Sequence, residues 1–389
     1  MVVAGRRLIA VHDESAPMSG QPRIRVVING RFLAQPTTGV QRFAREVLRA
    51  LDTMPGWKGV LAIPSDVVLV TADGVTVGGL PLARTSVRRV GRLTGHAWEQ
   101  FELPFATGGR PLVNLCNTAP LALWRQVVVI HDAGVFDIPQ AYQPAFRAWY
   151  RLLYAWHGRR AQSLASVSRF SADRLHEVVV PHSRPIHVLG NSGEHILRQP
   201  ADDAACGRLG LDGSPFILTV GSLAPHKNLA VVRAAKNLLG DGCPPIVAVG
   251  SLDSRVVRGA GGSGGSGILC TGRVSDAELR GLYERATCLV YPSLYEGFGI
   301  PPLEAMACGC PVIASDASSI PEACGESALL FDPASPESLA GRLSALLADD
   351  ALRARLAAQG RDHAAARSWE NVASRLVEVI AATMPDAVT

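Results

Sequence analysis

The chain of 389 residues is long enough for two or three domains, and its 48% hydrophobic content excludes disorder for most of its length. Its formal net charge of +4 is too small to imply binding to nucleic acid, but it suits an anionic ligand or an anionic membrane surface. No apolar run approaches the roughly 18 residues of a membrane-spanning helix, and no signal-peptide pattern is found, so we expect a cytoplasmic protein.

The eight cysteines are spread singly, apart from Cys308 and Cys310. This spacing predicts reduced thiols in a cytoplasmic setting. Cys308 and Cys310 could form a metal pair, but no second pair or nearby histidine supports one. We therefore interpret them as small buried residues around a turn.

The first half of the chain predicts a series of strands and helices. Residues 1–22 lack periodicity and are expected to form a flexible extension. Strands are predicted at Arg23–Asn29, Val60–Ile63, Val67–Thr71, Gln126–His131 and Ala165–Ser168. Helices are predicted at Val40–Leu51, Pro139–Ala161 and Phe170–Val178, the first from apolar residues that recur every three or four positions.

A second series follows the stretch 181–213, which is rich in Pro, Gly and Asp, as is typical of a hinge. Its strands are predicted at Phe216–Gly221, Ile246–Gly250, Ile268–Thr271, Leu289–Tyr291, Pro311–Ala314 and Ala328–Phe331. Its helices are predicted at Asn228–Leu239, Asp276–Ala286, Pro302–Cys308, Ser335–Leu347, Asp350–Ala366 and Glu370–Met384. The glycine-rich Gly259–Gly267 reads as a surface loop or an engineered linker.

Apolar strands that alternate with helices favour parallel sheets covered on both faces, so the predicted fold class is α/β. We expect an N-terminal domain at 23–200 and a C-terminal domain at 201–369. The last helix, at about 370–389, is expected to pack back on the N-terminal domain.

The most informative motif runs from Tyr291 to Pro311. Two carboxylates, Glu296 and Glu304, flank a turn at a helix start; the turn contains Gly297, Phe298, Gly299 and Ile300. Free backbone N–H groups at such a turn can bind a phosphate, and carboxylates accept hydrogen bonds from the vicinal hydroxyls of a sugar. Taken alone, Glu304 could simply favour the helix dipole and Glu296 could be an exposed loop charge. Together they indicate a binding site.

Three further elements follow strands or begin helices. The loop Gly221–Asn228 places Ser222, His226 and Lys227 where parallel sheets bind phosphates, although a lone lysine at a helix start is usually solvated. Gly39 at the start of the first helix could offer backbone N–H groups. His131, at the end of its strand, could bind a sugar hydroxyl or could be a satisfied buried histidine.

These motifs, in this order, resemble the retaining glycosyltransferases of family four, which have the GT-B fold. The resemblance covers about Arg23 to Trp369, and its most specific part is E-G-F-G-x-P-x-x-E-A-M-A, with Glu296 and Glu304 as the two acids. It departs in two places: many relatives have Arg where Ser222 or His226 stands, and many have two glycines where only Gly39 precedes the helix.

The resemblance implies two Rossmann-like domains that face each other across a cleft. Glu296 would then contact the hydroxyls of the donor sugar, and Glu304 the ribose. The backbone of Gly297, Phe298 and Gly299 would line the sugar and the diphosphate. Lys227 would stabilise the departing diphosphate. His131 would lie beside the transferred sugar, and Gly39 would approach the phosphates.

The expected function is transfer of a hexose from a nucleotide sugar to a glycan or polyprenyl-diphosphate-linked acceptor, with retention, in polysaccharide synthesis. GDP-mannose is the favoured donor and a UDP-sugar is possible. No Asp-x-Asp occurs in the chain, so no metal requirement is expected. Alternatives are a sugar-nucleotide epimerase or starch-type synthase of the same fold, or a non-catalytic nucleotide-sugar-binding protein.

A basic stretch of the sequence is the candidate site for binding the acceptor. It contains Arg84, Arg88, Arg89 and Arg92 and is followed by Trp98. With the helix Tyr142–Arg160, which is rich in Tyr, Trp and Arg, this stretch could dock an anionic lipid-linked acceptor at the inner membrane surface. The alternative is a solvated basic face above buried aromatic residues.

Overall fold

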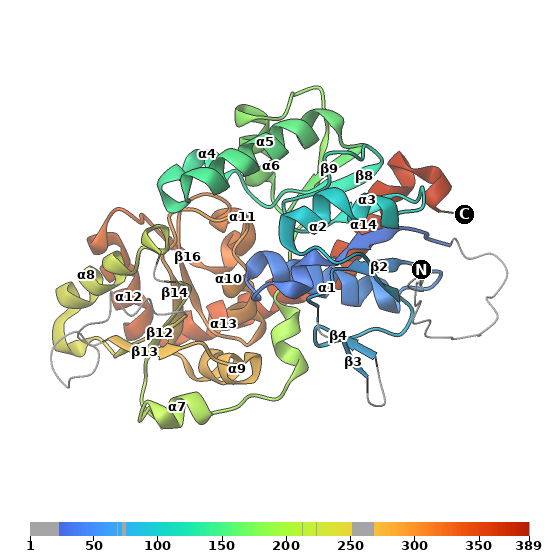
Figure 1. The fold of residues 1–389 in the computed structure, drawn as a ribbon. Helices are drawn as coiled ribbons and strands as arrows, with labels where there is room; N and C mark the ends of the chain where they lie inside the picture. The colour runs from blue at the N-terminus through green and yellow to red at the C-terminus, as the bar shows by residue number, and fades with distance from the viewer. Residues whose placement is uncertain are drawn as a thin grey trace. The chain divides into compact units, whose positions relative to one another are not determined.

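The computed structural model describes residues 23–67, 69–71, 75–211, 213–222, 224–250 and 268–388. These residues form two compact units, which are considered separately (Figure 1). Unit 1 contains the described residues up to Asp137, together with Tyr142–Gly190 and those from Trp369 onward. Unit 2 contains Ile138–Ala141 and Asn191–Ser368. The extension expected at 1–22 and the loop expected at Gly259–Gly267 lie outside the described residues.

A parallel sheet of seven strands forms the centre of unit 1, in the order β10-β9-β8-β7-β1-β2-β6. Its strands are β1 (Val27–Asn29), β2 (Val60–Ile63), β6 (Ser86–Arg89), β7 (Leu112–Asn114), β8 (Gln126–Val129), β9 (Ser163–Ser166) and β10 (Ile186–Val188). The interior strand β1 is buried along its whole length because helices cover both faces of the sheet.

Two helices from opposite ends of the chain pack together in unit 1. Helix α1 (Gly39–Thr53) lies against α14 (Trp369–Thr383), and the rings of Phe43 and Trp369 meet edge to face with centroids 6.0 Å apart. Trp369 is fully buried, so its replacement by Ala would cost about 3–5 kcal/mol. The last helix of the chain is therefore part of the core of unit 1.

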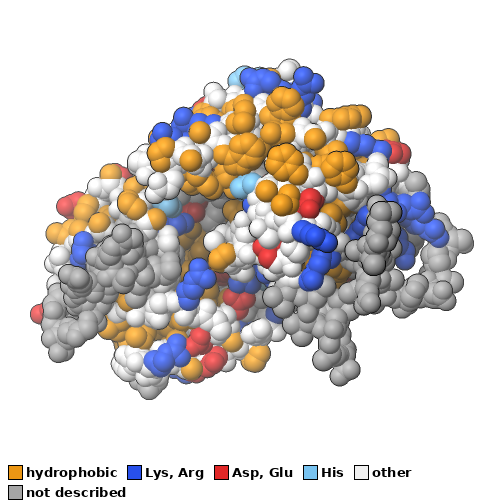
Figure 2. All heavy atoms as spheres, in the orientation of Figure 1, with side chains coloured by type: hydrophobic (Ala, Val, Ile, Leu, Met, Phe, Trp, Pro, Cys, Tyr) orange, Lys and Arg blue, Asp and Glu red, His pale blue; other side chains and the backbone are white. Residues whose placement is uncertain are grey.

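Other helices of unit 1 cover the sheet through separate hydrophobic clusters. Trp98 and Leu103, from α2 (Gly95–Phe101) and α3 (Leu103–Ala106), pack on Val27. The remaining helices are α4 (Gly134–Asp137), α5 (Pro144–Arg160) and α6 (Arg169–Val178). Figure 2 shows that hydrophobic side chains also gather on the outer surface over α2, α3 and α5.

A small antiparallel sheet was not predicted from the sequence. It consists of β3 (Leu69–Thr71), β4 (Val75–Val77) and β5 (Leu80–Pro81). The strand expected at Val67–Thr71 belongs to this sheet and not to the parallel series, so that assignment was wrong. Only three residues separate β3 from β4 in the sequence, which is too few for the crossover that a parallel pair requires.

The parallel sheet of unit 2 has six strands in the order β13-β12-β11-β14-β15-β16. They are β11 (Ile217–Val220), β12 (Ile246–Val249), β13 (Ile268–Gly272), β14 (Cys288–Tyr291), β15 (Val312–Ser315) and β16 (Leu329–Phe331). All six strands predicted from the sequence are present, with ends that agree within one or two residues.

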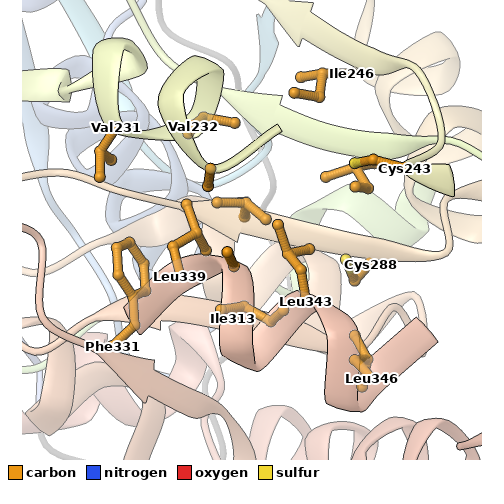
Figure 3. Packing of buried hydrophobic residues seen from close by; sticks show 14 of the residues in the cluster. Val231, Val232, Cys243, Ile246, Cys288, Ile313, Phe331, Leu339, Leu343 and Leu346 are labelled. Carbon is orange, nitrogen blue, oxygen red and sulfur yellow. The ribbon is translucent and has the colours of Figure 1, made fainter. Parts of the chain in front are cut away.

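Helices α8 (Leu229–Leu239) and α12 (Pro336–Ala348) pack together on one face of this sheet. Val231 and Val232 of α8 meet the cluster that contains Leu339 and Leu343 of α12, as Figure 3 shows. The other helices are α7 (Ala204–Arg208), α9 (Asp276–Arg285), α10 (Ile300–Ala307), α11 (Ile320–Cys324) and α13 (Asp350–Ala365). Short 3-10 turns complete both units: η1 (Gly30–Ala34), η2 (Pro139–Ala141), η3 (Glu194–Arg198), η4 (Pro225–Lys227), η5 (Gly240–Gly242), η6 (Gly325–Ser327) and η7 (Pro385–Ala387).

Both parallel sheets have the strand order of a Rossmann fold, so the predicted fold class is confirmed. In each sheet the order reverses at one place, between β7 and β1 in unit 1 and between β11 and β14 in unit 2. Ligands of such sheets bind at the carboxyl ends of the strands beside this reversal. Among the described helices, none has both the length and the apolar character needed to cross a membrane.

Candidate functional site

In unit 2, two loops leave the carboxyl ends of the neighbouring strands β11 and β14. The first leads through Ser222 to η4, and the second runs from Pro292 to Gly299, ahead of α10. The backbone N–H of Leu294 donates to the carbonyl of His226 at 2.8 Å, so the two loops are joined directly. The reversal point of the sheet therefore lies beneath both loops.

The two loops bring Lys227 and Glu296 together. Lys227 Nζ lies 2.5 Å from Glu296 Oε1, and the Tyr291 hydroxyl donates to the same oxygen at 2.6 Å. Both charged side chains keep some exposure, 21% for Lys227 and 14% for Glu296. An ammonium and a carboxylate that both reach solvent can bind the opposite charges and the hydroxyls of a ligand.

The surroundings of Glu296 favour its charged form. Burial alone would raise the pKa of this carboxyl, but the Lys227 ammonium and the hydrogen bonds from Lys227 and Tyr291 outweigh burial and lower the pKa. Burial and the neighbouring Glu296 carboxylate raise the pKa of Tyr291 well above its usual value. At neutral pH the cluster therefore contains one carboxylate, one ammonium and one phenol.

The loop that carries Glu296 is fixed by its neighbours. The backbone N–H of Glu296 donates to Ser318 Oγ at 3.0 Å, and the Ser319 hydroxyl donates to the carbonyl of Glu296 at 2.9 Å. Gly299 has a φ of +105°, which side chains with a Cβ rarely adopt, and it forms the N-cap of α10. The loop thus turns sharply into the helix at a glycine.

The donors at this turn are fewer than the sequence suggested. Pro301 and Pro302 occupy the first turn of α10 and have no N–H group. Phe298, Gly299 and Ile300 are buried, and within the described ranges no hydrogen-bond partner is found for their backbone N–H groups. Donors to an anion at this end would therefore come from these loop residues rather than from the prolines of the helix.

Glu304 is held from two sides. His195 Nε2 lies 2.8 Å from Oε1, and the Tyr283 hydroxyl donates to Oε2 at 2.9 Å. Burial, followed by the Glu304 carboxylate, raises the pKa of Tyr283 well above its usual value. The carboxylate is oriented within unit 2 by a histidine and a tyrosine that the sequence analysis did not identify.

The segment that carries His195 reaches α10 because of a glycine. A Cβ on Gly193 would collide with the backbone of Leu303 and Glu304. The chain enters unit 2 at Asn191, whereas the sequence placed the boundary at 200 and 201. Gly193 lies two residues before His195 in the sequence, but only the fold shows the close approach.

The first loop contains one unsatisfied buried atom. His226 Nδ1 is buried, and no partner for it occurs among the described residues. Burial, followed by the Lys227 charge, lowers the pKa of His226, while Glu296 opposes this shift. Ser222 on the same loop is exposed. His226 is therefore neutral at pH 7 and has a ring nitrogen available to a ligand.

In unit 1, His131 follows β8 and is almost completely buried. Its Nε2–H donates to the carbonyl of Leu115 at 2.8 Å, and its ring meets Phe43 edge to face. Burial lowers the pKa of His131 to about 4 despite that hydrogen bond. The side chain is therefore a neutral imidazole whose Nε2 is occupied, which agrees with the satisfied buried histidine considered as the alternative.

Gly39 begins helix α1 in unit 1. The backbone N–H of Thr38, which precedes it, donates to Gln41 Oε1 at 3.2 Å. No atom lies within 4 Å of the place where a Cβ on Gly39 would be, so this helix end is open.

The basic stretch that was expected to bind the acceptor makes hydrogen bonds within unit 1. Arg84 donates to the carbonyl of Met54, Arg88 to that of Ala106 and Arg89 to that of Val67. The backbone N–H of Arg92 donates to Glu102. Trp98 is fully buried and its Nε1 donates to Val90, so its expected contact with a membrane or acceptor was wrong. Helix α2 places this ring on its core side.

The cysteines and the acids add no further cluster. All eight cysteines are free thiols, and within the described ranges no three His, Cys, Asp or Glu side chains converge as they would around a metal ion.

Solved structures of other proteins share this fold. Sucrose-phosphate synthase from Thermosynechococcus elongatus covers 94% of this chain and 100% of its own, with a TM-score of 0.70 and 20% sequence identity. The Anabaena protein HepE in complex with UDP-glucose covers 92% of this chain and 100% of its own, with a TM-score of 0.65 and 14% identity. These likenesses establish the fold.

The sequence comparisons establish the family. Residues 207–363 match the family model of glycosyl transferases group 1. O-antigen chain mannosyltransferase B of Escherichia coli is 32% identical over 273 residues, which cover 66% of this chain and 70% of that protein. The chain belongs to the group 1 glycosyltransferases.

A second relative is longer. The serotype-specific mannosyltransferase WbdA of Escherichia coli is 26% identical over 382 residues, or 92% of this chain and 45% of that protein. The chain therefore spans less than half the length of that relative.

Proposed function

We propose that this glycosyltransferase moves mannose from GDP-mannose to a glycan or polyprenyl-diphosphate-linked acceptor, with retention as in family four, during synthesis of a bacterial surface polysaccharide. Several similar proteins are named as mannosyltransferases. They include O-antigen chain mannosyltransferase RfbU of Salmonella typhimurium, which is 26% identical over 79% of this chain and 87% of its own length. A lipid-linked acceptor would bring the enzyme to the inner face of the cell membrane.

The observation that carries the proposal is the cluster of Lys227, Glu296 and Tyr291 at the reversal point of the unit 2 sheet. Glu296 would accept hydrogen bonds from hydroxyls of the donor sugar, while Lys227 would bind the diphosphate. A diphosphate that draws the ammonium away from Glu296 leaves the carboxylate to Tyr291 and the sugar. Donor binding and orientation of Glu296 would then be coupled.

The charge that develops on the leaving diphosphate would be stabilised by Lys227 and by the backbone N–H groups of Phe298, Gly299 and Ile300. The acceptor oxygen bonds to the anomeric carbon as the bond from that carbon to the phosphate oxygen breaks. The acceptor proton passes to the departing phosphate on the same face of the sugar. This route needs no protein nucleophile, and we propose that it needs no metal ion.

Two other residues, Glu304 and His131, have supporting roles in the proposal. Glu304, already oriented by His195 and Tyr283, would accept hydrogen bonds from the ribose hydroxyls. His131 would meet the transferred sugar through Nδ1, because its Nε2 is occupied by Leu115. Its low pKa keeps the ring neutral, so Nδ1 would accept a hydrogen bond from a sugar hydroxyl, and no imidazolium would transfer a proton.

A turnover assay with labelled GDP-mannose, with and without a polyprenyl-diphosphate-linked oligosaccharide, tests the proposal. We expect mannosylated product only with the acceptor, and an α linkage by NMR when the donor is the α anomer. A new nucleotide sugar formed without acceptor would indicate an epimerase. Donor binding with neither transfer nor hydrolysis would indicate a binding protein. Transfer from UDP-glucose in preference to GDP-mannose would contradict the donor assignment.

A further inference from the structure

One surface of unit 1 exposes large apolar side chains. The exposed fractions are 69% for Phe101, 84% for Phe105, 65% for Trp124, 51% for Leu152 and 41% for Trp156. We call these five residues the aromatic face. Several large apolar side chains exposed together on a folded protein indicate an interaction site rather than ordinary surface.

The five residues lie on elements that meet around one loop, 119–125. The side chain of Gln100, next to Phe101, bonds the backbone of Ala119 and of Leu121 at 3.0 and 2.9 Å. From α5, Trp156 Nε1 donates to the carbonyl of Leu121 at 3.0 Å. The loop that carries Trp124 is therefore bordered by α2 and by α5, and Figure 2 shows the hydrophobic surface over these elements.

The outer side of α5 is exposed along one helix face in the part of the chain that the structure describes. Ala145, Ala148, Leu152, Trp156 and Arg159 are exposed at intervals of three and four residues. The opposite side, with Leu153 and Tyr154, is buried in the core of unit 1. Among the described residues, the core side of α5 is packed, whereas Leu152 and Trp156 on its outer side are exposed.

The charged residues of α5 and of residues 103–131 are all arginines. Helix α5 contains four arginines and no Asp or Glu, and residues 103–131 contain Arg110 and Arg125 and no acid. The Arg160 guanidinium lies over the Trp156 ring, 5.5 Å from its centroid. The acids nearby are committed elsewhere: Glu102 accepts from backbone N–H groups, and Asp386 pairs with Arg125.

We propose that the aromatic face and its arginines bind the anionic surface of a lipid bilayer. Phe and Trp side chains favour the headgroup region, and Arg side chains bind lipid phosphates. A second copy of the chain is a poorer occupant, because a symmetric contact through this face would bring arginines against arginines. This inference deepens the proposed function by naming the surface where a lipid-linked acceptor would be met.

Vesicle flotation tests the inference without donor or acceptor, so its outcome is independent of the proposed function. The intact chain is mixed with vesicles of phosphatidylethanolamine and phosphatidylglycerol, or with vesicles of phosphatidylcholine alone. We expect it to float with the anionic vesicles, less so with the neutral ones, and to be released as the salt concentration rises.

Two double variants separate the two contributions. Phe105→Ser with Trp124→Ser should lower the partition coefficient by about tenfold or more, since two exposed aromatic side chains are lost. Arg159→Gln with Arg160→Gln should lower it by roughly fivefold for each charge at low salt. The control is Leu238→Ser, an exposed apolar residue (57%) on α8 of unit 2, which should change nothing. Thermal melting confirms that each variant is folded.

The inference is overturned if the wild-type chain stays with the dense fraction in the presence of anionic vesicles. It is also overturned if the aromatic variant floats as well as the wild type, or if neutral vesicles bind equally. Concentration-dependent dimerisation that is lost in the Phe105→Ser, Trp124→Ser variant, without flotation, would assign the face to a second copy instead.

Discussion

The two units have the same strand order, but they use the reversal point of their sheets differently. In unit 1 the ends of β1 and β7 are bridged by side chains: Asn29 Nδ2 donates to Asn114 Oδ1 at 3.0 Å and to Glu99 Oε1 at 2.7 Å. Glu99 also accepts from Arg31 and Thr118, and it is completely buried. In unit 2 the corresponding place carries two loops whose charged residues still reach solvent.

The difference shows that the strand order of a Rossmann sheet does not by itself create a ligand-binding site. Burial would raise the pKa of Glu99, but His96, Arg31 and Asn29 lower it, so this carboxylate is charged and satisfied entirely by its own unit. Glu296 is also charged, yet both it and its partner Lys227 keep some exposure to solvent. We therefore expect substitutions of Glu99 to lower stability and substitutions of Glu296 to lower activity.

The largest effect is expected for Glu296→Ala. The variant should lose about a thousandfold or more in kcat/KM, because a site built to accept sugar hydroxyls loses its acceptor. Its melting temperature should change little, since Lys227 reaches solvent. Steady-state kinetics and a thermal melt measure both. Glu326→Ala, an exposed acid of unit 2, serves as control, and a Glu296→Ala enzyme with near-normal turnover would remove the proposed role.

Glu99→Ala should show the opposite pattern. Removing one member of a buried charged network leaves Arg31 without its carboxylate and should lower the free energy of unfolding of unit 1 by about 3–4 kcal/mol. Hydrogen exchange of the β1 and β7 amides measures this loss locally. The exposed Glu177→Ala is the matched control. Full protection of those amides in Glu99→Ala would contradict the structural role assigned to this network.

Lys227→Ala should reduce kcat/KM by about a hundredfold, the usual effect of losing one charge-stabilising group. The pH profile should change as well. Lys227 lowers the pKa of Glu296, so without it that pKa rises, and activity is lost at a higher pH as the solution is acidified. Lys236→Ala, on α8 of the same unit, should leave both rate and profile unchanged. An unshifted acid limb in Lys227→Ala would argue against the pairing.

His195→Ala should have a smaller effect, confined to donor binding. His195 orients Glu304 and is not proposed to touch the reacting atoms, so the KM for the donor should rise about tenfold while kcat stays near normal. His195→Gln, which keeps a donor near Glu304, should recover most of the affinity. A fall in kcat that Gln does not rescue would mean that His195 acts in some other way.

Chelation should have no effect. We expect the initial rate with EDTA to equal the rate with added magnesium or manganese, because the proposed mechanism meets the diphosphate charge with Lys227 and backbone N–H groups. A severalfold loss of rate in EDTA that a divalent cation restores would show that the diphosphate needs a metal ion.

The sequence predicted unit 2 much better than unit 1, for a physical reason. The six strands of unit 2 are short apolar runs with glycine or proline nearby, so each can be recognised alone. In unit 1, β6 reads as Ser-Val-Arg-Arg and has one apolar residue, and β7 has two, Leu112 and Val113, so neither forms a clear apolar run. Their pairing with β2 and β1 becomes apparent only in the folded sheet.

The candidate site shows the same limit. Lys227, Glu296 and Glu304 were identified because their loops have a distinctive local sequence. Tyr291, which donates a hydrogen bond to Glu296, lies close to it in the sequence. The residues that orient Glu304 come from more distant segments: His195 from η3 and Tyr283 from α9. Trp98 was assigned to the surface because a single sequence does not show which side of a short helix faces the core.

The most direct test of the account is calorimetric titration of the wild-type chain and of Glu296→Ala with GDP-mannose and with GDP. The account predicts that both proteins bind GDP similarly, because Lys227 and Glu304 are intact, whereas Glu296→Ala binds GDP-mannose at least about tenfold more weakly than the wild type does. Equal affinity of the two proteins for GDP-mannose, or no binding of GDP-mannose to the wild type, would contradict it.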